Sequence, residues 1–446
     1  MDRPTHPAPL FTRVTRPLRA FFNLEAAGGI LLLAASLVAL FWVNSAWGDS
    51  YHGLLALPVG LTLGGLGFST TLSTFVNDGL MTLFFLVVGM EIKREMLVGE
   101  LRDWRSALLP AIAALGGMIV PAGIYFALNR GGPGESGWGI PVATDIAFAV
   151  GCLRALGKRV PYSLVVFLTA LAIFDDIGGI LVIAFFYGSG VQLAWLVGAA
   201  VLTAAIALAG RLKVRNGLFY GVGGIALWYL LHHAGIHATI AGVVLGMCIP
   251  AFPLRPLGEV LRELHTFVGS LIARPQGIPL ENAQVLAIEE RLEDLEPPIN
   301  RFIHVLHPYV TFGIVPLFAL TNAGVPVMGM GLASVATAVP LGVILGLVLG
   351  KPLGIFGATW IALKLRVGPM PTGATWGKLF GVSIIAGIGF TVSLFIANLA
   401  FPTAPGLLGE AKLGVLLGSA ASAVVGALLL FLLPSPPVGD PAGARA

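Results

Sequence analysis

Two neighbouring aspartates, Asp175 and Asp176, lie near the middle of an otherwise apolar run, LTALAIFDDIGGILVIAFFYG, at residues 168–188. The run is long enough to cross a bilayer, which takes about 20 helical residues. An ionised side chain at mid-membrane costs about 2.5–3.5 kcal/mol on insertion scales, and such residues usually serve transport. Because neighbours on a helix diverge by about 100°, one carboxylate can face a water-filled funnel while the other faces another helix.

A buried carboxylate pair suits the exchange of two kinds of cation. Burial and mutual repulsion both favour the protonated form of a carboxyl group, so the pair can hold a proton at neutral pH. Carboxylate oxygens are also ligands for hard cations, which compete with protons for the same atoms. The aspartate pair therefore predicts a site at which loading sodium releases protons and loading protons expels sodium.

A buried lysine, Lys351, lies in a second apolar run, LGVILGLVLGKPLGIF. The prolyl ring of Pro352 removes a backbone hydrogen bond beside it. A lysine inside a membrane needs a carboxylate partner to stay charged, and we expect that partner to be Asp175 or Asp145. Glycines recur every fourth residue through the run, which predicts a smooth stripe for close helix packing. These are Gly342, Gly346, Gly350 and Gly354.

Two of the apolar segments are interrupted by polar or conformationally special residues. GIPVATDIAFAVG, at 139–151, carries Thr144 and Asp145, and AGIGFTVSLF, at 386–395, carries two closely spaced glycines. Interrupted segments at matching positions of two halves point to the binding site of an inverted-repeat transporter. Half-helix ends there carry partial charges, which we expect Asp145 to offset at the positive ends and Lys351 at the negative ends.

The elements that position these residues are predicted to be membrane-spanning helices. The 446-residue chain is 57% hydrophobic and only 11% charged, against about 25% charged for soluble domains. This composition predicts an all-α polytopic membrane protein with about 12 spans. Spans 3–5 and 10–12 would form the repeats, with spans 4 and 11 as two crossed, broken helices. The predicted spans are 26–46, 78–98, 107–128, 139–156, 162–187, 192–210, 217–233, 236–253, 304–323, 337–363, 379–400 and 412–433.

The distribution of basic residues orients these spans. If the N-terminus is inside, 23 of the 26 Lys and Arg residues fall on the inner side, so we expect both termini to be cytoplasmic. The predicted organisation is a cytoplasmic segment 1–25, a single transport domain 26–433 and a cytoplasmic tail 434–446. The net charge of +4 is spread over many short loops, which argues against a nucleic-acid partner.

Two connections are longer than turns. Residues 51–70 contain apolar stretches around two glycines, consistent with an external hairpin or with a loop that skims the membrane interface. Residues 254–303 form the only long polar segment, and an amphipathic helix is predicted inside it, with an apolar face at Val285, Ile288, Leu292 and Leu295. This cytoplasmic linker is either a solvated connection or a regulatory element.

Several motifs together resemble the sodium/proton antiporters of the NhaA type. They are ATDIAFAVG, ALAIFDDIGGILVIAFFY, GIHATIAGVVLG, HVLHPYV, PLFALTNAGV, GKPLGI and GIGFTVSLFIANLAF, in this order along the chain. The resemblance implies a multi-pass protein of the bacterial inner membrane. It would export Na⁺ or Li⁺ in exchange for a larger number of external protons, electrogenically, with pH regulation and without a cofactor. It also implies a homodimer formed through the hairpin 51–70.

The resemblance also assigns roles to residues of this chain. Asp175 and Asp176 would bind ion and proton, and Lys351 would pair with this site. Thr144 and Asp145 would lie at the crossed broken helices and contribute to the cation site. The pH response would involve Glu91, Lys93, Arg94, Glu95, His237, His304 and His307. Ile303 occupies a position where the family is expected to carry a glutamate, so the pH profile of this chain is open.

Other functions fit the sequence less well. Intramembrane aspartyl proteases need aspartates on separate helices with a GxGD motif, which is absent from the sequence. Magnesium-dependent prenyl transfer uses DDxxD, but the sequence here reads DDIGG. We therefore do not expect an enzyme. A sodium-coupled symporter of an organic solute with the same architecture is the alternative.

Overall fold

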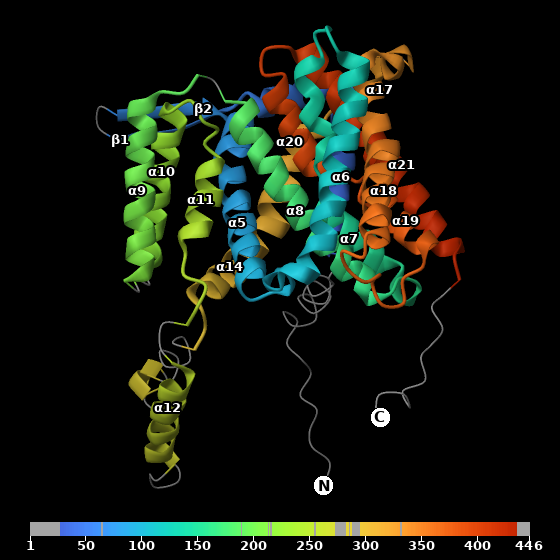
Figure 1. Ribbon diagram of the computed structural model, residues 1–446. Coiled ribbons are helices and arrows are strands. Elements are labelled where there is room, and N and C mark those ends of the chain that lie inside the picture. Colours follow the sequence, from blue (N-terminus) through green and yellow to red (C-terminus); the bar gives the residue numbers. More distant parts are fainter. Residues whose placement is uncertain are drawn as a thin grey trace, which may run out of the picture. The chain divides into compact units, whose positions relative to one another are not determined.

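The structure is a computed structural model in which most of the membrane-spanning part is described (Figure 1). Within the described part, eight helices are long and apolar enough to cross a membrane, or ten if two bent pairs each count as one span. The prediction of about 12 spans thus stays a prediction. The predicted terminal segments and the apolar face at Val285, Ile288 and Leu292 lie outside what is described. The described residues are 27–63, 66–188, 190–212, 214, 216–253, 256–272, 282–284, 286–287, 295–330 and 332–434.

Helix α10 (Gly217–His233) has the bounds that the sequence predicts, whereas the next helix is shorter than its predicted span. Helix α11 (Ile240–Cys248) has only nine residues of the predicted 236–253. The last turn of α11 is capped by Lys93, whose Nζ donates to the carbonyls of Met247, at 2.8 Å, and Ile249, at 2.5 Å. A lysine at a helix C-terminus satisfies carbonyls that have no partner within the helix.

The chain divides into two compact units. Unit 1 comprises the described residues up to Asn77, Asp103–Phe186 and the described residues from Val315 onward. Its long helices are α2 (Ala27–Val43), α6 (Trp104–Asn129), α8 (Tyr162–Phe186) and α21 (Pro405–Leu432). One further span of unit 1 consists of α17 (Ala338–Leu345), the π-helical turn η7 (Gly346–Gly350) and α18 (Lys351–Lys364).

The glycine stripe packs against α6, as predicted, and Figure 1 shows α6 and α18 side by side. A β-carbon on Gly354 would lie 2.1 Å from the carbonyl oxygen of Gly116, and one on Gly350 would lie 2.7 Å from Cα of Pro121. Such distances leave no room for a side chain, so the two backbones approach as closely as small residues allow.

Both predicted helix breaks are present in unit 1. A 3₁₀ helix, η3 (Glu135–Val142), is separated from α7 (Ile146–Ala155) by three non-helical residues. Helix α19 (Trp376–Ile385) is followed after four residues by α20 (Phe390–Ala400), with a bend of 45°. The breaks meet: the N–H of Asp145 donates to the carbonyl of Ile388 at 2.6 Å, and Oγ of Ser393 donates to the carbonyl of Ile140 at 2.7 Å.

Residues 58–63 and 66–71 form the two strands of a β-hairpin, and its predicted external position stays a prediction. Helix α3 (Gly48–Leu55) leads into β1 (Pro58–Leu63), which pairs antiparallel with β2 (Leu66–Thr71). Thr71 then caps the short helix α4 (Leu72–Thr74) by accepting the N–H of Thr74 at 3.2 Å.

Unit 2 comprises Asp78–Arg102 and Tyr187–Ile314. Helix α5 (Met81–Leu97) packs on α11, and α9 (Leu193–Arg211) packs on α10 (Figure 1). Helix α14 (Pro298–Tyr309) packs on α5. The polar linker contributes α12 (Leu257–Ile272), an amphipathic helix that the sequence interpretation did not identify.

The contact between α6 and α18 yields a test of the packing. Gly354→Ala places a methyl group on the backbone of α6, so we expect overpacking to lower the free energy of unfolding by about 1–3 kcal/mol. Gly357→Ala, on the same helix with no atom within 4 Å of the new methyl, is the matched control. Thermal unfolding in detergent measures both, and equal midpoints would contradict the packing described here.

Candidate functional site

An ion pair between Lys351 and Asp175 lies at the centre of unit 1. Both side chains are completely buried, and Nζ of Lys351 donates a short hydrogen bond to Oδ2 of Asp175. Lys351 directly follows the π-helical turn η7, whose irregular backbone precedes Pro352. Of the two partners predicted for Lys351, the structure selects Asp175. Mutual attraction in the low-dielectric interior offsets part of the cost of desolvating the two charges.

Thr144 joins this ion pair to the two helix breaks. Its hydroxyl accepts a hydrogen bond from Nζ of Lys351 at 2.9 Å and lies 2.7 Å from Oδ2 of Asp175. The same hydroxyl lies 2.8 Å from the carbonyl oxygen of Ala386, at the C-terminal end of α19. A hydroxyl carries one proton, so it donates to one of these two acceptors at a time. Lys351 therefore reaches the negative end of α19 through Thr144 rather than directly.

Only one of the two carboxylate oxygens of Asp175 takes part in the ion pair with Lys351. Oδ1 is buried, and among the described residues it has no hydrogen-bond partner. A buried polar atom without a partner is uncommon and calls for an explanation such as a proton or ion. Asp176 follows on the next position of α8 with 8% of its surface exposed, against 0% for Asp175. The two carboxylates thus differ in access, as their divergence on a helix predicts.

Asp145 links the N-terminal ends of the two broken helices. Its Oδ1 accepts the N–H of Phe148 at 3.0 Å and caps α7. Its Oδ2 accepts the N–H of Thr391 at 3.1 Å and the Thr391 hydroxyl at 2.6 Å, in the first turn of α20. Asp145 therefore lies where the sequence interpretation expects it, at two helix N-termini at which a negative charge is favourable. Its role as a cation ligand stays a prediction.

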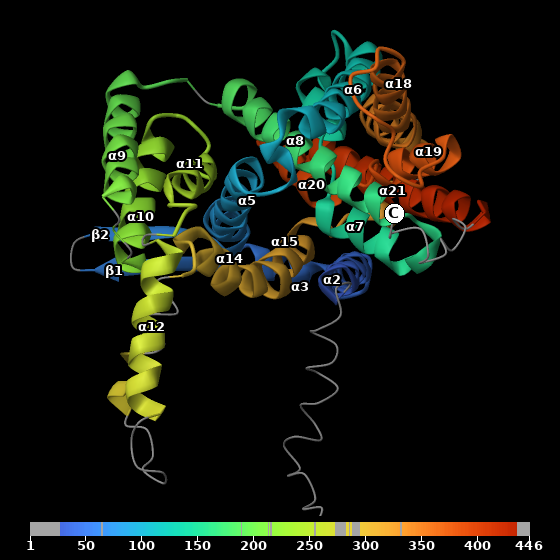
Figure 2. The ribbon, with the colours of Figure 1, turned by 60° about the horizontal axis from the view of Figure 1, so that its bottom comes forward.

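The sequence interpretation missed side chains that support the breaks. Thr391 holds Asp145, and Ser419 of α21 accepts the N–H of Phe390 at 3.2 Å. Figure 2 shows α21 running beside α20. Thr391 lies two residues after Gly389, the second glycine of the break, so the motif AGIGFTVSLF that predicted the break also contains this threonine. Nothing in the sequence around Ser419 marks it.

All residues predicted for the pH response lie in unit 2, whereas the aspartates, Thr144 and Lys351 lie in unit 1. Nε2 of His237 contacts the carbonyl oxygen of Tyr187 at 2.8 Å. Arg94 lies 3.6 Å from Glu95, and Nδ1 of His307 lies 3.3 Å from the hydroxyl of Thr311. The remaining members are Glu91 and Lys93 on α5 and His304 on α14. The pH-response assignment itself stays a prediction.

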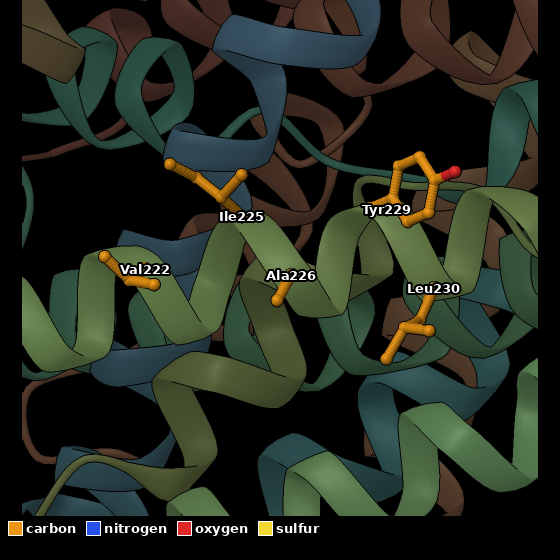
Figure 3. Close-up of a pocket in the computed structure, with 5 residues that line it drawn as sticks. All are labelled: Val222, Ile225, Ala226, Tyr229 and Leu230. Atoms are coloured by element: carbon orange, nitrogen blue, oxygen red, sulfur yellow. The ribbon is translucent and has the colours of Figure 1, made fainter.

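An apolar hollow beside α10 is a separate feature (Figure 3). Its lining residues Val222, Ile225, Ala226, Tyr229 and Leu230 all come from this one helix. None of the five carries a carboxylate, so these residues offer no charged ligand for a small cation.

The chain is similar to known proteins over nearly its whole length. Residues 19–430 match the protein family described as Na⁺/H⁺ antiporter 1. The chain belongs to this family. The Na⁺/H⁺ antiporter NhaA 1 of Myxococcus xanthus (strain DK1622) is 55% identical over 437 residues, 98% of this chain and 97% of that protein. The Na⁺/H⁺ antiporter NhaA of Anaeromyxobacter sp. (strain Fw109-5) is 54% identical over 436 residues, 97% of this chain and 95% of that protein. Membership of the Na⁺/H⁺ antiporter 1 family confirms the resemblance found in the sequence.

The ion pair of this family member predicts a large stability change. Lys351→Met leaves Asp175 buried without its cationic partner, so we expect the free energy of unfolding to fall by about 3–5 kcal/mol at pH 8. Asp175→Asn on the Lys351→Met background should restore part of the loss, because the uncompensated charge is then gone. Lys364→Met, an exposed lysine at the other end of α18, is the control. Additive effects of the two site substitutions on thermal unfolding would contradict the pairing.

Proposed function

We propose that the chain is a secondary active antiporter that exchanges cytoplasmic Na⁺ or Li⁺ for external protons at Asp175 and Asp176. The observation that carries the proposal is the buried Asp175 carboxylate, with one oxygen bonded to Lys351 and the other without a partner among the described residues. An oxygen in this position binds either a proton or a cation, and not both. Family membership supports the same activity and gives no support to a solute symporter.

The proposed exchange follows from the charges at the site. With both carboxylates ionised, the site carries two negative charges, and Lys351 supplies only one positive charge. The remaining negative charge attracts a small cation. A cation bound to the Asp175 and Asp176 oxygens excludes protons, and Thr144 can add its hydroxyl oxygen as a ligand. Protons that return to the carboxylates remove the negative charge and release the cation. A cycle that moves more protons than cations carries net charge and is driven by the membrane potential as well as by the pH gradient.

Asp145 has a second proposed role in this cycle. Because it caps α7 and α20 at once, it holds the two breaks together while the cation is exchanged. The partial charges of the half-helix ends then stay close to the site in both loading states. Asp145 is also a candidate cation ligand. Its Oδ2 would bind a cation if its hydrogen bonds with Thr391 were broken.

The surrounding organisation is part of the proposal. Twelve spans in two inverted repeats, with both termini cytoplasmic, are supported by the charge asymmetry of the loops and by the two breaks that meet. The bacterial inner membrane is the expected location. The β1–β2 hairpin is the proposed contact of a homodimer, since it offers paired strands outside the helical part. The transporter needs no cofactor and is not an enzyme in this scheme.

Regulation by pH is proposed to involve Glu91, Arg94, Glu95, His237, His304 and His307. The side chain of Ile303 on α14 is buried, where the family resemblance predicts a glutamate. A carboxylate missing from such a cluster removes one negative charge near the histidines. We therefore expect a pH profile that differs from that of relatives with the glutamate.

Transport in everted vesicles tests the exchange. Adding Na⁺ at pH 8 should dissipate a proton gradient, and Asp176→Asn should abolish this effect, because one of the two competing carboxylates is then lost. Asp103→Asn, which changes the exposed cap of α6 and keeps a capping side chain, should transport like the parent chain. Normal exchange by Asp176→Asn would overturn the assignment of the site.

Proton release from the purified protein tests the competition directly. Addition of Na⁺ or Li⁺ to the protein in weakly buffered detergent should acidify the solution, and addition of choline should not. Asp175→Asn and Asp176→Asn should each reduce the signal. Cation uptake without acidification would exclude competition for shared oxygens.

A further inference from the structure

At two positions the chain passes from one unit to the other within a continuous helix. Each of these helices contains a π-helical turn at the position of the crossing. The chain passes from one unit to the other at four points, of which two lie at helix ends or in loops, after Arg102 and after Phe186. The third lies between Asn77 and Asp78, inside the π turn η1 (Phe75–Leu80). The fourth follows Ile314, the last residue of the π turn η5 (Val310–Ile314).

A π turn is a local weakness in a helix. It contains one residue more than the α-helical turn, so its hydrogen bonds no longer follow the regular four-residue pattern. Such turns are a recognised cause of helix bending and are frequent at functional positions. Two of them at the two helical crossings therefore place bending points at the unit boundaries.

The sequence around η5 explains its irregular backbone. Pro308 precedes the turn and Pro316 follows it, and neither residue has an N–H to donate to the helix. Gly313 lies within the turn, where the backbone is least restrained by a side chain. The combination weakens the hydrogen-bond ladder on both sides of the crossing.

At η1, side chains replace part of the ladder. The carbonyl of Asp78 accepts the hydroxyl of Thr82 at 2.6 Å and Nε1 of Trp228 at 3.4 Å, all within unit 2. A hydroxyl that bonds back to the carbonyl four residues earlier competes with the backbone and bends helices. The irregular turn is thus stabilised by specific partners.

An asparagine cluster in unit 1 joins the crossing at η1 to the broken helix α20 and to the end of α15 (Val315–Asn322), the helix that follows η5. Nδ2 of Asn322, at the end of α15, donates to Oδ1 of Asn77 in η1 at 2.8 Å. Oδ1 of Asn322 accepts Nδ2 of Asn398, on α20, at 2.8 Å. Lys412 of α21 lies 3.4 Å from the same oxygen. Asn322 is buried, so these bonds form away from water and are costly to leave unmade.

The two crossing helices also carry most of the residues predicted to respond to pH. Helix α5 continues η1 and bears Glu91, Arg94 and Glu95, and α14 precedes η5 and bears His304 and His307. The ion pair and both breaks lie on the other side of these turns, in unit 1.

We propose that η1 and η5 are paired hinges at which the chain bends between the units during exchange. The Asn77–Asn322–Asn398 cluster connects η1 directly to α20 and connects η5 to α20 through α15. The inference rests on the proposed function and adds where the movement occurs. Transporters alternate access mainly by rigid-body movement of one bundle against another, so bending concentrated in two short turns leaves each unit intact. A charge change on α5 or α14 then acts on the helix directly attached to a hinge.

Gly313→Ala tests the second hinge. No atom lies within 4 Å of the new methyl group, so the substitution adds no clash and only favours regular helix. We expect turnover in reconstituted liposomes to fall about fivefold, with an unchanged apparent affinity for Na⁺. Gly221→Ala on α10, an equally open helical glycine of unit 2, is the control and should keep parental turnover. Parental turnover of Gly313→Ala would overturn the hinge assignment.

Thr82→Val tests the first hinge independently, including the case in which Gly313→Ala does not fold. It removes the hydroxyl that bonds the Asp78 carbonyl and keeps the shape of the side chain. Thr203→Val, which removes the same kind of bond to Ala199 at 2.7 Å in α9, is the matched control. Lower turnover in Thr82→Val alone supports the hinge, and equal turnover of the two variants contradicts it.

Proton release upon Na⁺ addition separates the two proposals. A hinge variant should release protons like the parent protein while transporting slowly, because the site in unit 1 is unaltered. Parental protein that releases no protons would refute the exchange site, whatever the hinge variants do. A hinge variant that loses proton release together with transport would refute the hinge, since its effect would then lie on the site.

Discussion

The buried pairing of Lys351 with Asp175 is the interaction on which the arrangement of unit 1 depends. A lysine and an aspartate with no exposed surface are tolerable in a membrane only as partners, so the helices that carry them must meet at one depth. Helix α18 comes close enough because glycines face α6. Thr144 then connects the pair to the end of α19 through the carbonyl of Ala386. The ion pair is thus a structural contact, and its aspartate is also half of the proposed exchange site.

Broken helices expose polar backbone groups inside the membrane, which intact helices do not. A regular helix hides its N–H and carbonyl groups, whereas a break exposes helix ends with partial charges inside the membrane. In unit 1 these ends have charged partners: Asp145 serves the N-terminal ends of α7 and α20, and Lys351 reaches α19 through Thr144. Charge and backbone interruption therefore stabilise each other. Loss of either would leave buried polar groups without partners.

The proposed hinges matter because the proposed exchange site and the proposed pH-response residues lie in different units. The residues proposed to exchange proton and cation belong to unit 1, while the residues proposed to respond to pH belong to unit 2. A change of charge in unit 2 can therefore affect the proposed site in unit 1 through the chain segments that connect the units. Helical crossings transmit movement better than loops because a helix is stiff except at its irregular turns. The π turns η1 and η5 place that flexibility in two short segments.

The sequence by itself determined the chemistry of this protein. Aspartates and a lysine in apolar runs are so costly that their presence alone predicts a transport site, and the positions of glycine and proline predicted both breaks and the packing stripe. Tertiary structure decided the partners: Lys351 could have paired with Asp145, and only folding brought it to Asp175 and Thr144. It also decided the contacts of Thr391, Asn322 and Ser419. These polar residues look ordinary in sequence, because a hydrogen bond between distant segments leaves no local pattern to read.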